Sequence, residues 1–308
     1  MKTMKRRAFI ARSVLVSLGT TALASACARM TRPARSHRFE ISLAEWSLHR
    51  TLRAGQLDHL DFAVAARRDY GLTAVEYVNS FFKDKARDTS YLRELQRRAD
   101  DAGVRSVLIM CDGEGQLGDV DAGKRAQAVE NHYQWVEAAR FLGCHSIRVN
   151  AESPAASPIE QMKLAADGLR QLAEYGAQHA IDIIVENHGG SSTNGDWLLA
   201  LLRLVDHPRL GTLPDFGNFQ TAPGEWYDRY RGVDQMMPYA RGVSAKSHDF
   251  DANGNEVNTD YRRMMQIVLR HGYRGYVGIE YEGDRLSEPD GIKATRDLLL
   301  RVRAELGE

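Results

Sequence analysis

Four polar residues recur at nearly equal intervals, each at or just after the end of an apolar segment. Glu186 ends IDIIVE, Asp215 ends LGTLPD, His248 follows SAKS, and Glu280 ends YVGIE. They are 29, 33 and 32 residues apart, about the length of one unit of strand and helix. Three carboxylates and an imidazole at equivalent positions have the chemistry to hold a divalent metal ion and to move a proton.

Segments of strand length and of helical length alternate from residue 39 onwards. The first strand is expected in FEISLAEWSL, ending near Trp46, and the pattern continues through eight strands and eight helices. Strict alternation predicts parallel strands of the α/β class, closed into a single-domain (β/α)8 TIM barrel over residues 39–308. The alternative is an open doubly wound sheet. That fold normally has a glycine-rich loop after its first strand, which LAEWSLHR lacks.

In such a barrel the carboxyl ends of all strands meet at one rim. Glu186, Asp215, His248 and Glu280 would then end strands five to eight and face a common point. Three clustered carboxylates repel one another unless a cation neutralises them, so the sequence predicts one divalent metal ion held by these four residues. The mixed oxygen and imidazole ligands suit Mn, Mg, Co or Zn and do not select among them.

Two residues share the facing of the expected ligands, because alternate residues of a strand point to the same side. His188 follows Glu186 by two positions, and Lys246 precedes His248 by two. His188 is a candidate acid for a leaving group or a donor to a substrate oxygen, with a loop hydrogen bond as the alternative. Lys246 is a candidate for stabilising an enediolate oxygen, with a simple ion pair as the alternative.

Further rim residues have side chains that suit a polyol. Glu76 is expected to end strand two and Asn150 strand four, where each would bind a substrate hydroxyl. Arg148 faces the same way as Asn150 and would bind substrate or pair with Glu152. Trp46 would stack on a sugar face or pack against the barrel top.

The motifs VENHGG, PDFGN, SAKSHDF and GIEYEG, in this order, resemble the xylose isomerase-like barrel superfamily. This superfamily includes ketose 3-epimerases, hydroxypyruvate isomerase, inosose dehydratase and endonuclease IV, and the resemblance covers about residues 39–306. It implies that Glu186 and Glu280 also work as an acid/base pair, one on each face of the sugar. The ENHGG form is most similar to the dehydratase and to exported members, some of which eliminate the aglycone from 3-keto-glycosides.

The expected function is therefore a metal-dependent sugar isomerase or epimerase that removes a proton next to a carbonyl through an enediolate. Elimination by a 3-keto-glycoside lyase or dehydratase on the same site is the alternative, and a non-catalytic sugar-binding lipoprotein is the second. The sequence departs from ketose 3-epimerases, because Asn218 stands where they carry a histidine and no arginine follows His248 closely. A free ketose is thus a disfavoured substrate, and oligomeric state is left open.

The first 26 residues have the pattern of an export signal. A basic start containing Arg6 and Arg7 resembles a twin-arginine signal, with a general secretory leader as the alternative. Cleavage after Ala26, or lipidation of Cys27 at the lipobox-like LASAC, would place the protein in the periplasm, with residues 27–38 as a linker. The remaining chain has 36 basic and 41 acidic residues, a charge of −5, which argues against nucleic acid as a partner.

Cys111 and Cys144 are expected at opposite ends of neighbouring strands. Such positions lie roughly 15 to 20 Å apart, beyond disulfide reach. The sequence predicts two free, buried thiols.

Overall fold

The structure is a computed structural model that describes residues 39–307. The predicted export signal (1–26), linker (27–38) and lipid-carrying Cys27 lie outside the described residues. None of the helices in the described range is both long and apolar enough to cross a membrane.

Eight parallel strands form one curled sheet in the order β6-β5-β4-β3-β2-β1-β10-β9. Two isolated parallel bridges, Thr212 to Ala240 and Asp215 to Ser244, join the β6 end of this sheet to the β9 end. The predicted (β/α)8 barrel is therefore confirmed. The strands are β1 (Glu40–Ala44), β2 (Ala74–Val78), β3 (Arg105–Met110), β4 (Ser146–Val149), β5 (Asp182–Glu186), β6 (Leu210–Leu213), β9 (Val243–Ser247) and β10 (Tyr276–Tyr281).

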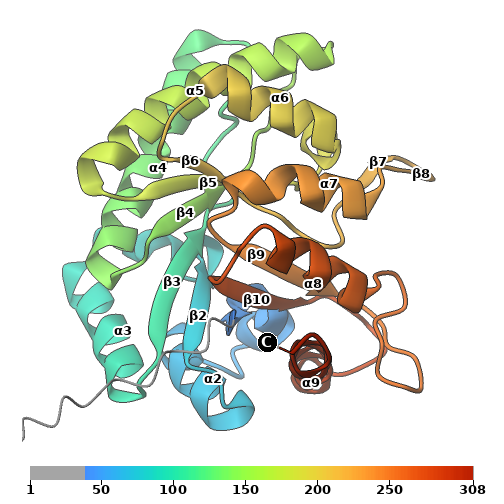
Figure 1. Cartoon of the computed structure of the whole chain (residues 1–308). Helices are drawn as coiled ribbons and strands as arrows, with labels where there is room; N and C mark the ends of the chain where they lie inside the picture. The colour runs from blue at the N-terminus through green and yellow to red at the C-terminus, as the bar shows by residue number, and fades with distance from the viewer. Residues whose placement is uncertain (1–38, 308) are drawn as a thin grey trace, which may run out of the picture. The chain divides into compact units, whose positions relative to one another are not determined.

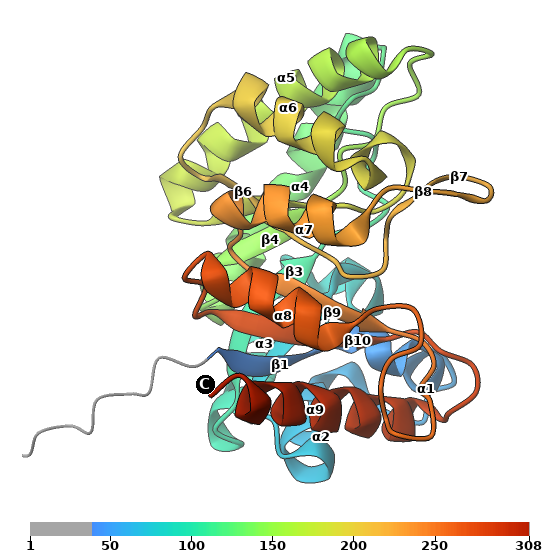
Figure 2. The same ribbon diagram turned by 45° about the vertical axis from the view of Figure 1, so that its right-hand side comes forward.

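Helices lie around the outside of the strands (Figure 1). Eight of them follow the predicted segments. The short α1 and a two-stranded hairpin, β7 (Gln220–Ala222) with β8 (Glu225–Trp226), were not predicted, and the hairpin projects away from the barrel (Figure 2). The helices are α1 (His49–Arg53), α2 (Phe62–Tyr70), α3 (Thr89–Asp101), α4 (Ala122–Leu142), α5 (Pro158–His179), α6 (Gly195–Val205), α7 (Arg229–Met236), α8 (Tyr261–Arg270) and α9 (Glu288–Glu305).

Local sequence signals explain where helices begin and end. The Asp88 carboxylate accepts hydrogen bonds from the backbone N–H groups of Ser90 and Tyr91 at the start of α3. Gly71 and Gly143 end α2 and α4 with φ of 69° and 77°, a left-handed conformation that glycine adopts without strain. The two glycines keep short the connections that lead from α2 into β2 and from α4 into β4.

Apolar side chains pack on both faces of the sheet, so most strands are buried along nearly their whole length. The larger cluster lies between strands and helices, and a smaller one, including Leu108, Ile184 and Leu213, fills the barrel interior. Cys111 and Cys144 are buried and unpaired, which confirms the prediction of two free thiols.

Two predicted strand ends are wrong. β1 stops at Ala44, and Trp46 lies in a 3-10 turn formed by residues 45–48. β2 continues to Val78, so Glu76 lies at the centre of its strand rather than at the rim. Both errors arise because an apolar run does not show where backbone pairing stops.

Candidate active site

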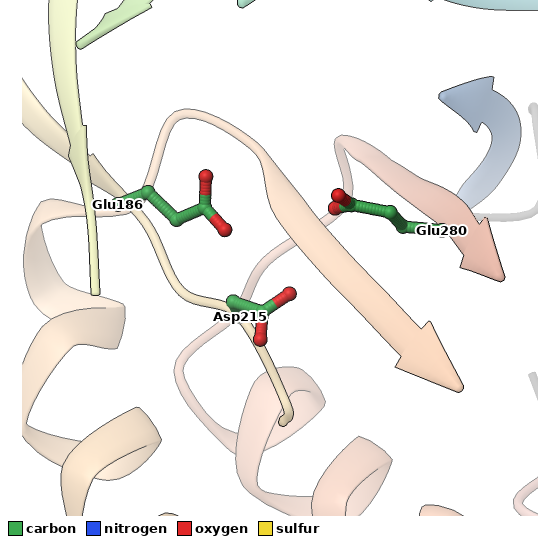
Figure 3. A group of neighbouring side chains, drawn as sticks. All are labelled: Glu186, Asp215 and Glu280. Atoms are coloured by element: carbon green, nitrogen blue, oxygen red, sulfur yellow. The ribbon is translucent and has the colours of Figure 1, made fainter. Parts of the chain in front are cut away.

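Three carboxyl groups meet at the rim of the barrel. Glu186 is the last residue of β5, Asp215 follows β6 by two residues, and Glu280 lies near the end of β10. Each offers an oxygen, and these oxygens all lie within 4.8 Å of one another. Figure 3 shows the carboxyl groups pointing toward one another from three separate elements. We call these residues the carboxylate cluster.

The turn after β6 holds Asp215 rigidly. Its Oδ1 accepts hydrogen bonds from the backbone N–H groups of Gly217 and Asn218, each at 2.8 Å. The Asn187 side chain accepts from the backbone N–H of Asp215 at 2.8 Å and donates to the Asp215 carbonyl at 3.1 Å. The asparagine of ENHGG thus ties the end of β5 to the turn that carries Asp215.

Ser244 links Asp215 to Glu280. Its Oγ lies 2.7 Å from Asp215 Oδ2 and 2.7 Å from Glu280 Oε2. A hydroxyl has one proton to donate, so Ser244 can donate to only one of the two carboxyl groups. The other contact is a hydrogen bond only if that carboxyl group carries a proton and donates it to Ser244 Oγ. The arrangement therefore suits a cluster that retains one shared proton.

Arg148 is the cation beside Glu186. Its Nε lies 2.8 Å from Glu186 Oε2, close enough for strong charge attraction, although the angle is not that of a hydrogen bond. Its Nη1 donates to Asp112 Oδ1 at 2.7 Å, and Asn150 Nδ2 donates to the same oxygen at 2.8 Å. The predicted pairing of Arg148 with Glu152 is not what the structure shows, because Asp112 and Glu186 take up its guanidinium.

The three carboxyl groups differ in proton affinity. Burial raises the pKa of Glu186 to about 7, although Arg148 opposes this, and burial raises the pKa of Asp215 to about 7 against the pull of Lys246. Burial also acts on Glu280, but the Lys246 ammonium and the Ser244 hydroxyl outweigh it and lower the pKa of that carboxyl. Glu280 is thus the member most readily ionised.

Lys246 places its ammonium within the cluster. Nζ lies 3.5 Å from Glu280 Oε1, 3.9 Å from Asp215 Oδ2 and 3.4 Å from Glu282 Oε1, with the side chain 2% exposed. From the sequence, a metal ion alone was expected to relieve the repulsion among the carboxylates. In the structure, Lys246 and Arg148 relieve part of it.

His248 does not join the carboxylate cluster. Its side chain is 41% exposed, and Nε2 lies 3.9 Å from Glu282 Oε2. β9 ends at Ser247, so the alternation that would have aimed His248 inward no longer applies at that position. The prediction of His248 as the fourth ligand disagrees with this placement, and the inward positions of β9 are held by Ser244 and Lys246.

A cavity of about 360 Å³ opens above the cluster. Of the residues predicted from sequence, Trp46, Arg148, Asn150, His188 and Glu280 line it. Trp46 reaches it from the 3-10 turn, with its ring stacked on His49 at a centroid distance of 4.9 Å. Glu280 is the member of the cluster that lines the cavity, since Glu186 and Asp215 are fully buried.

Sequence reasoning missed three residues of this site, namely Asp112, Ser244 and Glu282. Asp112 follows β3 by two residues, and Ser244 and Glu282 lie two residues from Lys246 and Glu280. Ser244 and Glu282 therefore carry the same spacing signal as His188 and Lys246. Asp112 had the same signal as Asp215, a carboxylate just beyond a buried strand.

His188 stands between two cavities. Besides the first, it lines a second cavity of about 590 Å³ together with Gln161 and Trp197, and Glu152 is also common to both. The backbone N–H of His188 donates to Ser192 Oγ at 3.0 Å, which fixes the loop and leaves the ring to face the cavities. Burial lowers the pKa of His188, and the nearby Arg148 and Lys246 lower it further.

Glu76 lies inside the barrel and does not line the cavity. Its carboxyl is fully buried, accepts a hydrogen bond from Ser42 at 2.5 Å, and has no hydrogen-bond partner at Oε2 among the described residues. Burial raises the pKa of this carboxyl to about 8. Glu76 is therefore not placed to contact a substrate hydroxyl, because β2 continues two residues beyond the end that was predicted for it.

The residues present fit a divalent metal ion. The three carboxylates supply converging oxygens, and Glu186 Oε2 has no hydrogen-bond donor in the described part of the chain. Hard divalent cations take such oxygen ligands. A buried acidic cluster of this kind is consistent with a divalent metal.

Comparison with known proteins identifies related chains. A family described as "Xylose isomerase-like TIM barrel" matches residues 64–302. A solved structure of a xylose isomerase-like TIM barrel protein from Mycobacterium smegmatis, in complex with magnesium, superposes with a TM-score of 0.66 at 18% identity, covering 87% of this chain and 98% of the other. At that identity the likeness shows the shared fold.

Two curated relatives match in sequence. The C-glycoside deglycosidase alpha subunit of Arthrobacter globiformis is 38% identical over 89 residues, which are 27% of this chain and 23% of that protein. The putative hydroxypyruvate isomerase of Homo sapiens is 27% identical over 207 residues, 61% of this chain and 74% of that protein. The first match thus spans about a quarter of its relative's length.

Proposed function

The chain belongs to the xylose isomerase-like TIM barrel family, which comprises sugar isomerases, epimerases and dehydratases, and we propose that it removes a proton next to the carbonyl of a sugar or keto-sugar with Glu280 as the base. Isomerisation or epimerisation is the primary proposal. The observation that carries it is the position of Glu280, which belongs to the carboxylate cluster and also lines the cavity.

The surroundings of Glu280 suit a base. Lys246 and Ser244 keep its carboxyl ionised despite burial, so it accepts a proton without first losing one. The same contacts fix its orientation, because both partners lie on β9 and Lys246 is paired in register with Glu280. A rigid, ionised carboxylate at a cavity wall is what abstraction of a carbon-bound proton requires.

Other cavity residues would bind and orient the sugar. Arg148, fixed by Asp112, presents a charged donor to a substrate oxygen, and Asn150 presents an amide. Trp46 offers an aromatic wall for the apolar face of a ring. His188, on the wall shared with the second cavity, is placed to donate or accept a proton away from Glu280.

A divalent ion held by Glu186, Asp215 and Glu280 would polarise the carbonyl and make the adjacent C–H more acidic. After Glu280 takes the proton, delivery of a proton by a second acid to the opposite face of the same carbon would give an epimer. Return of the proton to the neighbouring carbon gives an isomer. Glu186, buried beside Arg148, would help to hold the ion, and its role as the second acid/base group stays a prediction.

Solvent exchange tests the proposal directly. Protein incubated in deuterium oxide with Mn²⁺ or Mg²⁺ and a panel of ketoses and keto-glycosides should incorporate deuterium next to the carbonyl, detected by NMR. Glu280→Gln should lower that incorporation by about 10³-fold or more. No exchange with any compound, together with saturable binding of a sugar, would instead favour a sugar-binding protein without turnover.

Elimination from a keto-glycoside is a second candidate, and the cavity behind His188 favours it. The two cavities share His188 and Glu152 and measure about 360 and 590 Å³, which leaves space for a leaving group beside the sugar. Similarity to a C-glycoside deglycosidase subunit, confined to 89 residues, points the same way. In this reaction Glu280 would again take the proton, and His188 would protonate the departing group in its imidazolium form, which its lowered pKa confines to the acidic side of neutrality.

His188→Ala separates the two candidates. For elimination, the variant should keep deuterium exchange and lose release of the aglycone, because only the second step needs the imidazole. For isomerisation or epimerisation, a keto-monosaccharide should be converted as fast as a keto-glycoside. The ratio of exchange to product formation, measured on both substrates, decides between them.

We also propose that the protein is exported to the periplasm, on the basis of residues 1–26 and Cys27. Fractionation of cells expressing the whole chain should place it outside the cytoplasm, and substitution of Arg6 and Arg7 by lysine should retain it inside. Labelling with a radioactive fatty acid should depend on Cys27 if the chain is lipidated.

A further inference from the structure

We propose that Lys246 is the built-in cation of the carboxylate cluster, and that its ammonium and a divalent metal ion compete for Asp215 and Glu280. Three contacts of Nζ with carboxylates carry this inference: Glu280 Oε1 at 3.5 Å, Asp215 Oδ2 at 3.9 Å and Glu282 Oε1 at 3.4 Å. Two of these carboxylates are also members of the group that could hold a metal ion.

The barrel builds this position for the lysine. Lys246 lies on β9, in register with Glu280 on β10, so its backbone cannot move without disturbing two paired strands. Its stem passes over Gly217, where an added Cβ would lie 3.1 Å from both Lys246 Cγ and Cδ. Gly217 thus leaves room for the stem, and the ammonium reaches the carboxylates through a space shaped for it.

A metal ion at the same carboxylates would lie near this ammonium. Two cations in a site shielded from water repel each other, because the low local polarity does not screen them. Binding of the metal ion must therefore displace the ammonium or tolerate its charge. The structure offers a place for displacement, since Glu282 Oε1 lies 3.4 Å and Asn218 Oδ1 3.4 Å from Nζ and neither residue belongs to the cluster.

The consequence is that the native chain binds divalent metal ions more weakly than its three carboxylates would allow. Removing the ammonium should strengthen binding, whereas a lysine that merely assisted the site would not have that effect. This inference concerns the cluster alone and is tested without substrate, so its failure would leave the proposed proton exchange untouched.

The experiment measures Mn²⁺ binding by the electron paramagnetic resonance signal of free Mn²⁺. Native protein, Lys246→Met and Lys246→Gln are titrated, with Lys83→Met as the matched control, since Lys83 lies 3.6 Å from the buried Glu114 outside the cluster. Both Lys246 variants should bind one Mn²⁺ at least tenfold more tightly than the native protein, and Lys83→Met should match the native protein. Adding Asp215→Asn to Lys246→Met should remove the tight site.

Equal or weaker Mn²⁺ binding by the Lys246 variants would overturn the proposal. So would tight binding that survives Asp215→Asn, because the ion would then lie elsewhere. Circular dichroism shows whether the variants fold. Variants that fold only when Mn²⁺ is added would support the proposal, since the ion would be replacing the missing ammonium, whereas variants that stay unfolded with Mn²⁺ would count against it.

Discussion

Glu280 and Glu76 are both buried carboxyl groups of the same barrel, and they differ in the cations around them. Glu280 has Lys246 at 3.5 Å and Ser244 at 2.7 Å, and the pKa of its carboxyl is lowered. Glu76 has a hydrogen bond from Ser42 and no ion pair among the described residues, and burial raises the pKa of its carboxyl to about 8. Placement of positive charge, rather than depth, therefore decides which carboxyl is ready to accept a proton.

The largest effect should come from removing the rim carboxylate. Glu280→Gln should lower deuterium exchange by about 10³-fold or more, since a positioned base contributes roughly 10² to 10⁴ and the cluster also loses a charge. Glu130→Gln, on the exposed face of α4, is the matched control and should behave as the native protein. Near-native deuterium exchange in Glu280→Gln would show that Glu280 is not the base and that its difference from Glu76 has no role in catalysis.

Glu76 should affect the pH dependence of stability rather than that of activity. Its carboxyl is neutral in the folded barrel up to about pH 8, whereas an unfolded glutamate ionises near pH 4.5. Its contribution to the free energy of unfolding is thus full below about pH 4.5 and is lost as the pH rises toward 8.

Glu76→Gln should accordingly raise stability at pH 8.5 by several kcal/mol, at about 1.4 kcal/mol per pKa unit, and change it little at pH 4.5. Urea unfolding at both pH values measures this, with Glu40→Gln, at the exposed first residue of β1, as the control. Equal stability changes at the two pH values would show that Glu76 is not protonated in the folded state.

Arg148→Met should make Glu186 resemble Glu76, as a buried carboxyl group without a guanidinium beside it. The variant leaves a fully buried carboxyl without the guanidinium that lies 2.8 Å away. Leaving a buried charge unpaired costs about 3 kcal/mol or more. The loss in unfolding free energy should be larger at pH 8.5 than at pH 6, because the carboxyl escapes the cost by binding a proton. Arg203→Met, exposed near the end of α6, should lose little at either pH.

The sequence predicted the barrel and three members of the cluster because these depend on regular spacing. A strand-helix repeat fixes which residues end β5, β6 and β10, whatever the side chains around them. His248 lies outside the cluster because β9 ends one residue before it, and apolar patterning does not mark where a strand ends. The contacts of Ser244, Arg148 and Lys246 depend on which side-chain rotamers reach across neighbouring strands. The spacing of residues in the sequence does not determine those rotamers.

The smallest effect should come from a matched pair of serines. Ser42 donates to Glu76, and Ser244 lies between Asp215 and Glu280. Ser42→Ala should lower the free energy of unfolding by about 1 kcal/mol, the contribution of one buried hydrogen bond, and leave deuterium exchange within twofold. Ser244→Ala should cost a similar amount of stability and in addition slow exchange about tenfold, because Glu280 loses a partner that keeps it ionised and oriented. Deuterium exchange rates and urea midpoints are measured for both variants. Equal effects of the two substitutions on exchange would contradict the distinction between Glu280 at the rim and Glu76 in the barrel interior.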